Sequence, residues 1–189
     1  MRTRLLIAVA TATLIAGCQQ KAPEVSNDTA ATNAVAPADS APGKTNAVLG
    51  PAASGDQAKT LMHDRHEGME DIGDAFKVVN RELKAGSPNV SAIQAAAASI
   101  AANAEKSSGW FPPGTGPDVG KTRAKAEIWQ KPEDFAAKDA AFLKATQAFK
   151  AAADSGDVAA IKTQAGELGK TCKACHDPYR APEGGHGHD

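Results

Sequence analysis

Two cysteines and a histidine lie close together near the C-terminal end of the chain, in the stretch TCKACHDPYR. Cys172 and Cys175 are three residues apart, so in a helix both sulfurs leave the same face about one turn apart. Two thiols placed in this way can add to the two vinyl groups of one porphyrin, and the imidazole of His176 can stand beneath the iron. The pattern Cys-x-x-Cys-His therefore predicts one covalently attached haem c.

Three other interpretations apply to cysteines and histidines of this kind. A disulfide oxidoreductase usually carries its Cys-x-x-Cys pair at the N-terminus of a helix that follows a strand, and this sequence shows no strand pattern. A tetrahedral zinc site needs a fourth ligand, for which only His186 and His188 of the tail are available. A haem-free structural or metal-handling protein that uses these tail histidines is the third alternative. Glycine-rich termini are usually mobile, so no metal site is assigned to the tail.

Four stretches with helical periodicity must position these side chains. The first runs from Asp56 to Lys84, and the pair Ser87-Pro88 predicts the start of the second. The third follows Pro132 and carries phenylalanines at heptad spacing, and Asp157 is the predicted N-cap of the fourth. The inward stripe of the first helix is Met62, Arg65, Met69, Ile72, Phe76, Val79 and Leu83, and that of the fourth includes Leu168, Cys172 and Cys175.

A long connection separates the second and third of these helices. Between Gly109 and Gly120 the sequence contains WFPPGTGP, which excludes a helix. A short helical stretch is expected around residues 121–130. Four amphipathic helices with one long crossover predict an all-α protein, a four-helix bundle over residues 56–180.

The N-terminal part of the chain has the features of an exported protein. Arg2 and Arg4 precede an apolar run that is too short to span a bilayer, which indicates a signal peptide over residues 1–17. The residues LIAGC resemble a lipobox, so Cys18 is the expected lipidation site; the alternative is a plain secretory signal in which Cys18 is incidental. Residues 18–55 are rich in Ala, Pro, Ser, Thr and Asn and are expected to form a flexible tether, and residues 181–189 a mobile His/Gly tail.

Charge and compartment limit the partners. The 189 residues include 21 basic and 22 acidic side chains, so the electrostatic footprint of a nucleic-acid-binding protein is missing and no nucleic acid is expected. The lipid on Cys18 would tether the protein to a membrane without spanning it. Gln19 resembles the pattern of outer-membrane sorting, so we expect the periplasmic side of a bacterial cell envelope, with the outer membrane favoured over the inner.

Several motifs together resemble one family. The residues Cys172 to Arg180 near the C-terminus look like the signature of the cytochrome c prime family, the class II cytochromes c. The pair Arg65-x-x-x-Met69, the crossover residues WFPPGT and the segment Ile128-Trp129 support this resemblance, which covers roughly Asp56 to Arg180.

The resemblance implies more than the spacing alone. It implies an antiparallel bundle with haem c between the first and fourth helices, and His176 as the proximal ligand. It also implies that Arg65 lies near a haem propionate and that Arg180 lies close to the proximal histidine. Pro178 has no amide hydrogen, so the hydrogen-bond ladder of the helix must weaken just past His176.

The residue on the distal side decides the expected function. Met69 stands where the family has its distal residue, and a thioether is a good ligand for haem iron. We therefore expect ligation by His176 and Met69, as in the low-spin branch of the family, and a non-enzymatic electron carrier that serves redox partner proteins of the envelope. The alternative is that Met69 only fills space in the core, which leaves a five-coordinate iron that binds nitric oxide or other small gases. A homodimer paired through the first helices, as in many family members, is a candidate assembly.

Two neighbours of Met69 are alternative candidates for the distal ligand. Met62 lies two helical turns away, about 10 Å along the helix axis, and cannot serve the same iron in the family register. His66, one turn before Met69, could give bis-histidine ligation, but we expect it to be a partly exposed histidine.

Overall fold

The computed structural model describes residues 49–182, all within one compact unit of the chain. The predicted signal peptide, the predicted lipidation site Cys18, most of the predicted tether and residues 183–189 lie outside the described residues. The helices are α1 (Gly55–Lys84), α2 (Val90–Ser107), α3 (Glu127–Gln130), α4 (Pro132–Ser155) and α5 (Val158–Tyr179). Strands are missing from this part of the chain, and none of its helices is long and apolar enough to cross a membrane.

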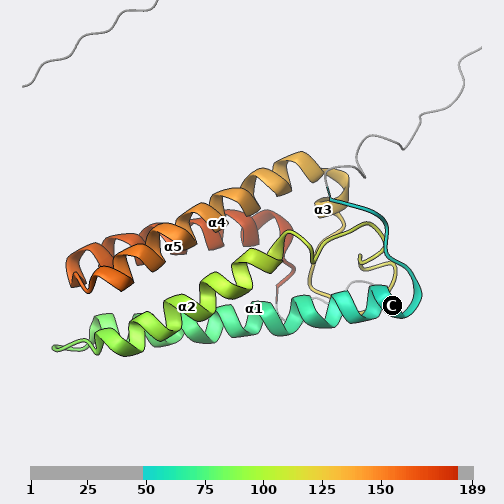
Figure 1. Ribbon diagram of the computed structural model, residues 1–189. Helices are drawn as coiled ribbons and strands as arrows, with labels where there is room; N and C mark the ends of the chain where they lie inside the picture. The colour runs from blue at the N-terminus through green and yellow to red at the C-terminus, as the bar shows by residue number, and fades with distance from the viewer. Residues whose placement is uncertain (1–48, 183–189) are drawn as a thin grey trace, which may run out of the picture. The chain divides into compact units, whose positions relative to one another are not determined.

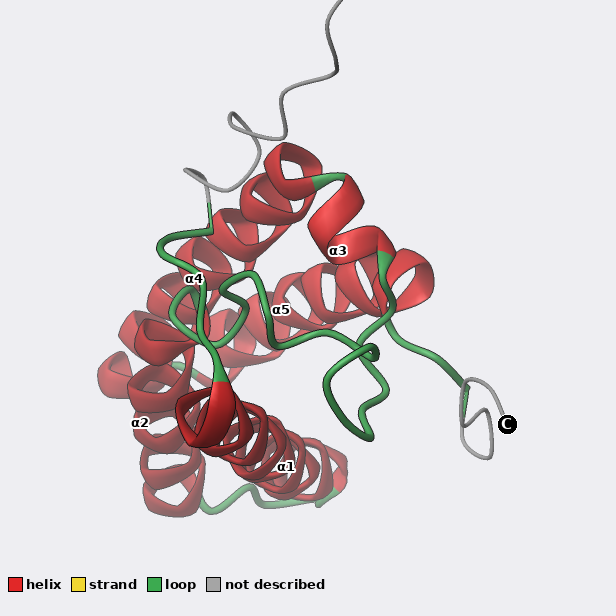
Figure 2. Cartoon of the chain, turned by 90° about the vertical axis from the view of Figure 1, so that its right-hand side faces the viewer, coloured by secondary structure: helices red, strands yellow, loops and turns green. Residues whose placement is uncertain are grey.

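The four long helices form the predicted bundle (Figure 1). α1 packs along α2, α2 along α4, and α4 along α5, whereas α1 and α5 approach each other only sparsely. Figure 2 shows the four long helices from one end, with the crossover between α2 and α4 covering that end. The side of the bundle between α1 and α5 is therefore the least filled by helix-to-helix contact.

The apolar stripes meet in one core. The heptad phenylalanines Phe135, Phe142 and Phe149 of α4 are all buried, as expected from their period. Small residues, mainly alanines, form much of the α2 face and allow its neighbours to pack closely. The largest side chains that are fully enclosed in the core are Phe149, Ile93, Ile100, Ile128, Ile161, Leu168 and Val79.

The helix ends confirm one predicted cap and correct another. Asp157 caps α5, where its carboxylate accepts hydrogen bonds from the amides of Ala159 and Ala160. The predicted start at Ser87-Pro88 is wrong, because Asn89 is the N-cap of α2. The Asn89 side chain accepts from the amide of Ala92 at 3.1 Å, a bond that Ser87 is too early in the chain to make.

The other two boundaries also shift. The stretch expected around residues 121–130 is helical only over Glu127–Gln130. Residues 49–54, which the sequence assigns to the tether, belong to the packed part of the structure: Leu49 and Ala53 are buried. The amide of Ala53 donates to the carbonyl of Pro113 at 2.8 Å. Burial is therefore already present at Leu49, before α1 begins.

A glycine allows the crossover to lie against α1. A methyl group built on Gly68 would come within 2.3 Å of Cη2 and 2.4 Å of Cζ2 of Trp110. Trp110 is buried and cannot swing into solvent without leaving the core. Only glycine fits at this point of α1.

We expect Gly68→Ala to lower the free energy of unfolding by about 1–3 kcal/mol, since the added methyl overpacks the contact with Trp110. The matched control is Gly166→Ala in α5, where a methyl meets no atom within 4 Å. The control should raise stability by up to about 1 kcal/mol through helix propensity. Urea denaturation measures the change in the free energy of unfolding for each variant. Equal changes in the two variants would contradict the close approach at Gly68.

Candidate functional site

α5 carries the two cysteines on its half-buried face. Cys172 and Cys175 pack against the core on the stripe of Leu168, and both are free thiols. Burial raises the pKa of the Cys172 thiol, and burial together with the negative charge of Asp139 raises the pKa of Cys175 to about 11. The thiols are therefore protonated at neutral pH. A disulfide oxidoreductase requires the opposite, a thiol with a lowered pKa.

His176 follows on the same part of α5. The residue keeps contact with solvent, but the surrounding protein partly desolvates the ring and so lowers its pKa. The positive charges of Arg180 and Arg123 act in the same direction. A lowered pKa favours the neutral imidazole, which is the form that binds a metal.

The crossover holds the end of the helix that carries His176. The amide of Lys125 donates to the carbonyl of Tyr179 at 2.9 Å, and the amide of Ala181 donates to the carbonyl of Arg123 at 2.8 Å. The guanidinium of Arg123 donates to the carbonyl of Ala181 as well. Pro178 removes one amide from the helix ladder, as the sequence predicts, and this antiparallel pairing secures the chain just beyond it.

Tyr179 has a role that the sequence analysis missed. Its buried ring packs edge-to-face on Phe135, with 5.4 Å between ring centroids, and its hydroxyl donates a short hydrogen bond to Asp134 of α4. This hydrogen bond holds the pKa of Asp134 below its usual range. The signal was present in the motif, because a tyrosine three residues after His176 lies one turn further along the helix.

Arg65 lies inside the fold with its charge intact. Only 5% of the residue is exposed, and burial lowers its pKa to about 10, still far above neutral pH. Nη1 donates to the carbonyl of Trp110 at 3.1 Å and to Oγ1 of Thr115 at 3.4 Å. Nη2 donates to the carbonyl of Thr115 at 3.1 Å and to Oγ1 of Thr122 at 3.0 Å. All four acceptors belong to the crossover.

Aromatic rings complete the surroundings of Arg65. The guanidinium carbon lies 5.0 Å from the ring centroid of Phe111 and 6.0 Å from that of Trp129. Phe111 packs in turn on Phe135, with 4.6 Å between centroids. A continuous row of contacts thus leads from Arg65 on α1 through Phe111 and Phe135 to Tyr179 on α5. The proximity of Arg65 to a haem propionate stays a prediction.

Met69 is half-buried one turn after Arg65 and packs against the core. Met62 points elsewhere: its methyl lies 3.1 Å from the position that a Cβ on Gly120 would occupy, so it contacts the crossover. His66 is exposed, and its Nε2 lies 3.4 Å from a carboxylate oxygen of Glu70. Of the three side chains weighed for the distal position, Met69 is the one that packs against the buried core.

These residues fit the donor set of haem c. Two protonated, half-buried thiols and an imidazole that favours its neutral form come from the last turns of α5. Met69 and Phe76 lie on α1, and α1 meets α5 where the Phe76 ring comes within 3.7 Å of a Cβ built on Gly169. The two helices otherwise approach sparsely, so the least filled side of the bundle lies between the helix that carries Met69 and the helix that carries the thiols. A haem between α1 and α5 agrees with this arrangement.

Comparison with known proteins gives consistent matches. A family model described as Cytochrome C' matches residues 60–180. A cytochrome c' from Allochromatium vinosum is 35% identical over 132 residues, which cover 68% of this chain and 85% of that protein.

Two solved structures have similar folds. One, a cytochrome c' with ligand-controlled dimer dissociation, has a TM-score of 0.63 at 31% identity, covering 68% of this chain and all of the other. The second is a nitric oxide complex of a variant cytochrome c prime from Alcaligenes xylosoxidans. Its TM-score is 0.60 at 27% identity, covering 66% of this chain and 97% of the other.

We expect Arg65→Gln to lower the free energy of unfolding by about 2–3 kcal/mol, because the buried carbonyls of Trp110 and Thr115 lose their donors. Arg65→Lys should recover only part of this loss, since one ammonium cannot reproduce the fork of the guanidinium. Arg81→Gln is the matched control, because Arg81 is exposed and forms an ion pair with its neighbour Glu82. Chemical denaturation of the three variants tests the ranking, and equal stabilities would contradict it.

Proposed function

Because this chain belongs to the cytochrome c' family, we propose that it carries one covalent haem c and binds a small gas such as nitric oxide. Haem c proteins of this family act in electron transfer or gas binding. Bound haem would supply an iron that takes up one electron or one small ligand. Residues on α5 would hold the haem, and Met69 on α1 would border its distal side.

Cys172, Cys175 and His176 would hold the group. The two thiols leave one face of α5 and would form thioether bonds, and the neutral imidazole of His176 would be the proximal ligand. The pairing of the crossover with residues 179–181 fixes the backbone just after this imidazole. The positive charge of Arg180 near His176 would oppose protonation of the imidazole.

The observation that carries the gas-binding proposal is the packing of Met69. Its side chain belongs to the apolar layer around the core, where it would act as a hydrophobic wall on the distal side. The solved nitric oxide complex shows that a related bundle at 27% identity takes up this gas. That likeness supports the same chemistry for this chain.

A second function is favoured by the chemistry of the same side chain. The Met69 thioether is a soft ligand, and ligation by His176 and Met69 would make the protein an electron carrier for redox proteins of the cell envelope. One residue thus separates the two functions, neither of which needs substrate turnover.

The proposed location rests on residues outside the described part of the chain. The signal peptide and the lipobox-like residues before Cys18 support export and acylation, with a tether that leaves the bundle facing the periplasm. The dimer dissociation described for a similar cytochrome c' supports a homodimer as a candidate assembly of this protein too.

Covalent attachment can be tested directly. We expect protein matured with the c-type haem apparatus to keep its haem after denaturation, as shown by haem staining and by mass. Cys172→Ala and Cys175→Ala together should abolish the covalent signal. Cys18→Ala, which removes the third cysteine, should leave it intact. A wild-type chain that weighs no more than its polypeptide and lipid would refute the proposal.

The ferric spectrum and a nitric oxide titration separate the two functions. A gas-binding protein should show a high-spin ferric spectrum that is largely unchanged in Met69→Leu, because leucine keeps the apolar wall, and the ferrous form should bind nitric oxide. A low-spin ferric spectrum that becomes high-spin in Met69→Leu would instead establish ligation by Met69. That result would overturn the gas-binding proposal in favour of electron transfer.

A further inference from the structure

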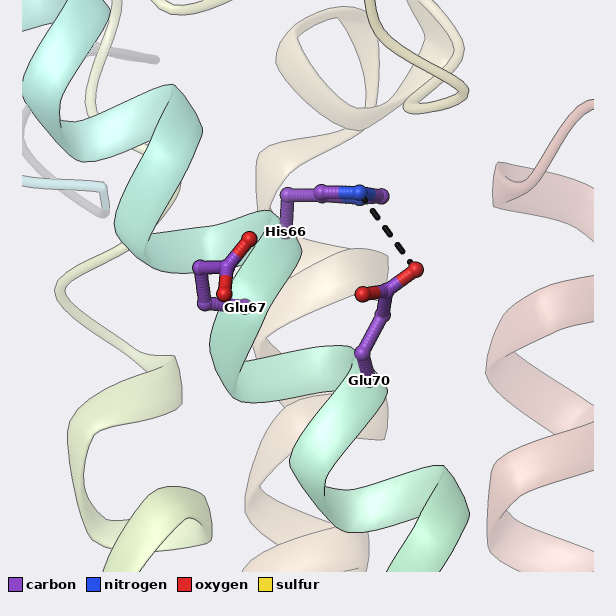
Figure 3. A group of neighbouring side chains, drawn as sticks. All are labelled: His66, Glu67 and Glu70. Atoms are coloured by element: carbon purple, nitrogen blue, oxygen red, sulfur yellow. Dashed lines mark ion pairs between the residues drawn. The ribbon is translucent and has the colours of Figure 1, made fainter.

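A second group of ligand-type side chains lies on the solvent face of α1. His66, Glu67 and Glu70 each offer one atom, and these three atoms lie within 4.8 Å of one another (Figure 3). All three residues are exposed. We propose that they form a surface site for one divalent cation of the zinc class, distinct from the haem-binding residues.

The distance between the two best-placed donors suits zinc. Zinc binds imidazole nitrogen at about 2.0–2.1 Å and carboxylate oxygen at about 2.0–2.2 Å, which places two ligands of a tetrahedron about 3.4 Å apart. Nε2 of His66 and Oε1 of Glu70 are 3.4 Å apart. Figure 3 shows these two side chains converging from successive turns of α1. A cation can therefore replace their present contact without movement of the backbone.

Glu67 supplies the third ligand. It lies next to His66 in the sequence, and its carboxylate also faces His63, whose Nδ1 is 3.9 Å away. The side chain is exposed and has three rotatable bonds, so it can turn toward the cation at small cost in packing. Three protein ligands leave one position of the tetrahedron for water.

The charge of this part of α1 also favours a cation. Between Thr60 and Phe76 the sequence has five acidic residues and one basic residue, Arg65. Arg65 is buried with its guanidinium bonded to the crossover, so it does not neutralise the solvent face. Like charges spaced three or four residues apart destabilise a helix, and a bound cation would relieve that repulsion.

The ligand types select among metals. Calcium and magnesium prefer sites made of oxygen atoms alone, whereas an imidazole together with carboxylates suits zinc and related transition metals. The histidine is what distinguishes this cluster from an ordinary acidic surface. We therefore commit to zinc as the cation to be tested.

The test uses the full-length holoprotein with His186→Gln and His188→Gln, so that the tail histidines cannot compete. Zinc is added as its chloride in competition with a chromophoric chelator, and we expect one equivalent to bind. His66→Gln and Glu70→Gln should each weaken binding by at least about tenfold, the lower end of what even outer-shell changes cost a metal site. At the same zinc concentration, the melting temperature should rise more in the His186→Gln/His188→Gln protein than in these two variants.

His63→Gln is the matched control, because it removes another exposed histidine from the same helix. It should change zinc affinity much less than His66→Gln, since His63 is not among the three clustered ligands. Glu105→Gln on α2 should change nothing. The proposal is overturned if the parent protein binds no zinc, or if His66→Gln and Glu70→Gln bind zinc as tightly as Glu105→Gln. The exposed positions of all these side chains keep the variants folded, and the haem spectrum checks this.

Discussion

The structure depends on one buried charge, the guanidinium of Arg65. Burying an unpaired charge is costly, and here the cost is offset by four hydrogen bonds to the crossover and by two aromatic rings. The acceptors are carbonyls and hydroxyls rather than a carboxylate, so the crossover must adopt one shape to supply them all. The same crossover pairs with residues 179–181 at the end of α5. The crossover is thereby joined to α1 through Arg65 and to α5 just beyond His176, so it fixes the positions of both helices.

The periodic parts of the fold could be predicted from the sequence. Apolar stripes define the buried faces of the helices, and Asp157 is recognisable from its residue type and position as the N-cap of α5. The nonperiodic parts could not be predicted in the same way. Asn89 displaces the expected cap at Ser87 because the choice depends on which side chain reaches a free amide. The burial of Leu49 and the hydrogen bond of Ala53 to the crossover depend on tertiary structure, which local composition does not encode.

The candidate site also has features that helical spacing predicts and features that depend on tertiary contacts. The spacing of Cys172 and Cys175 fixes their shared face, because both lie on one helix. The partners of Arg65 were beyond the reach of spacing rules, since they lie 45–57 residues away in a segment without regular structure. Tyr179 was overlooked because a motif states which residues are present and not what they touch. Its bond to Asp134 joins α5 to α4 next to the proposed haem ligand.

The backbone of α1 around Met69 is held in place by contacts with the crossover. One turn before Met69, Arg65 is hydrogen-bonded to the crossover. Gly68, the residue that precedes Met69, lies against the ring of Trp110. A shift of the helix backbone would break both contacts at once. The freedom that remains is rotation about the side-chain bonds of Met69, which is unbranched and flexible. The two proposed functions, electron transfer and gas binding, would therefore differ by the orientation of one thioether against a fixed backbone.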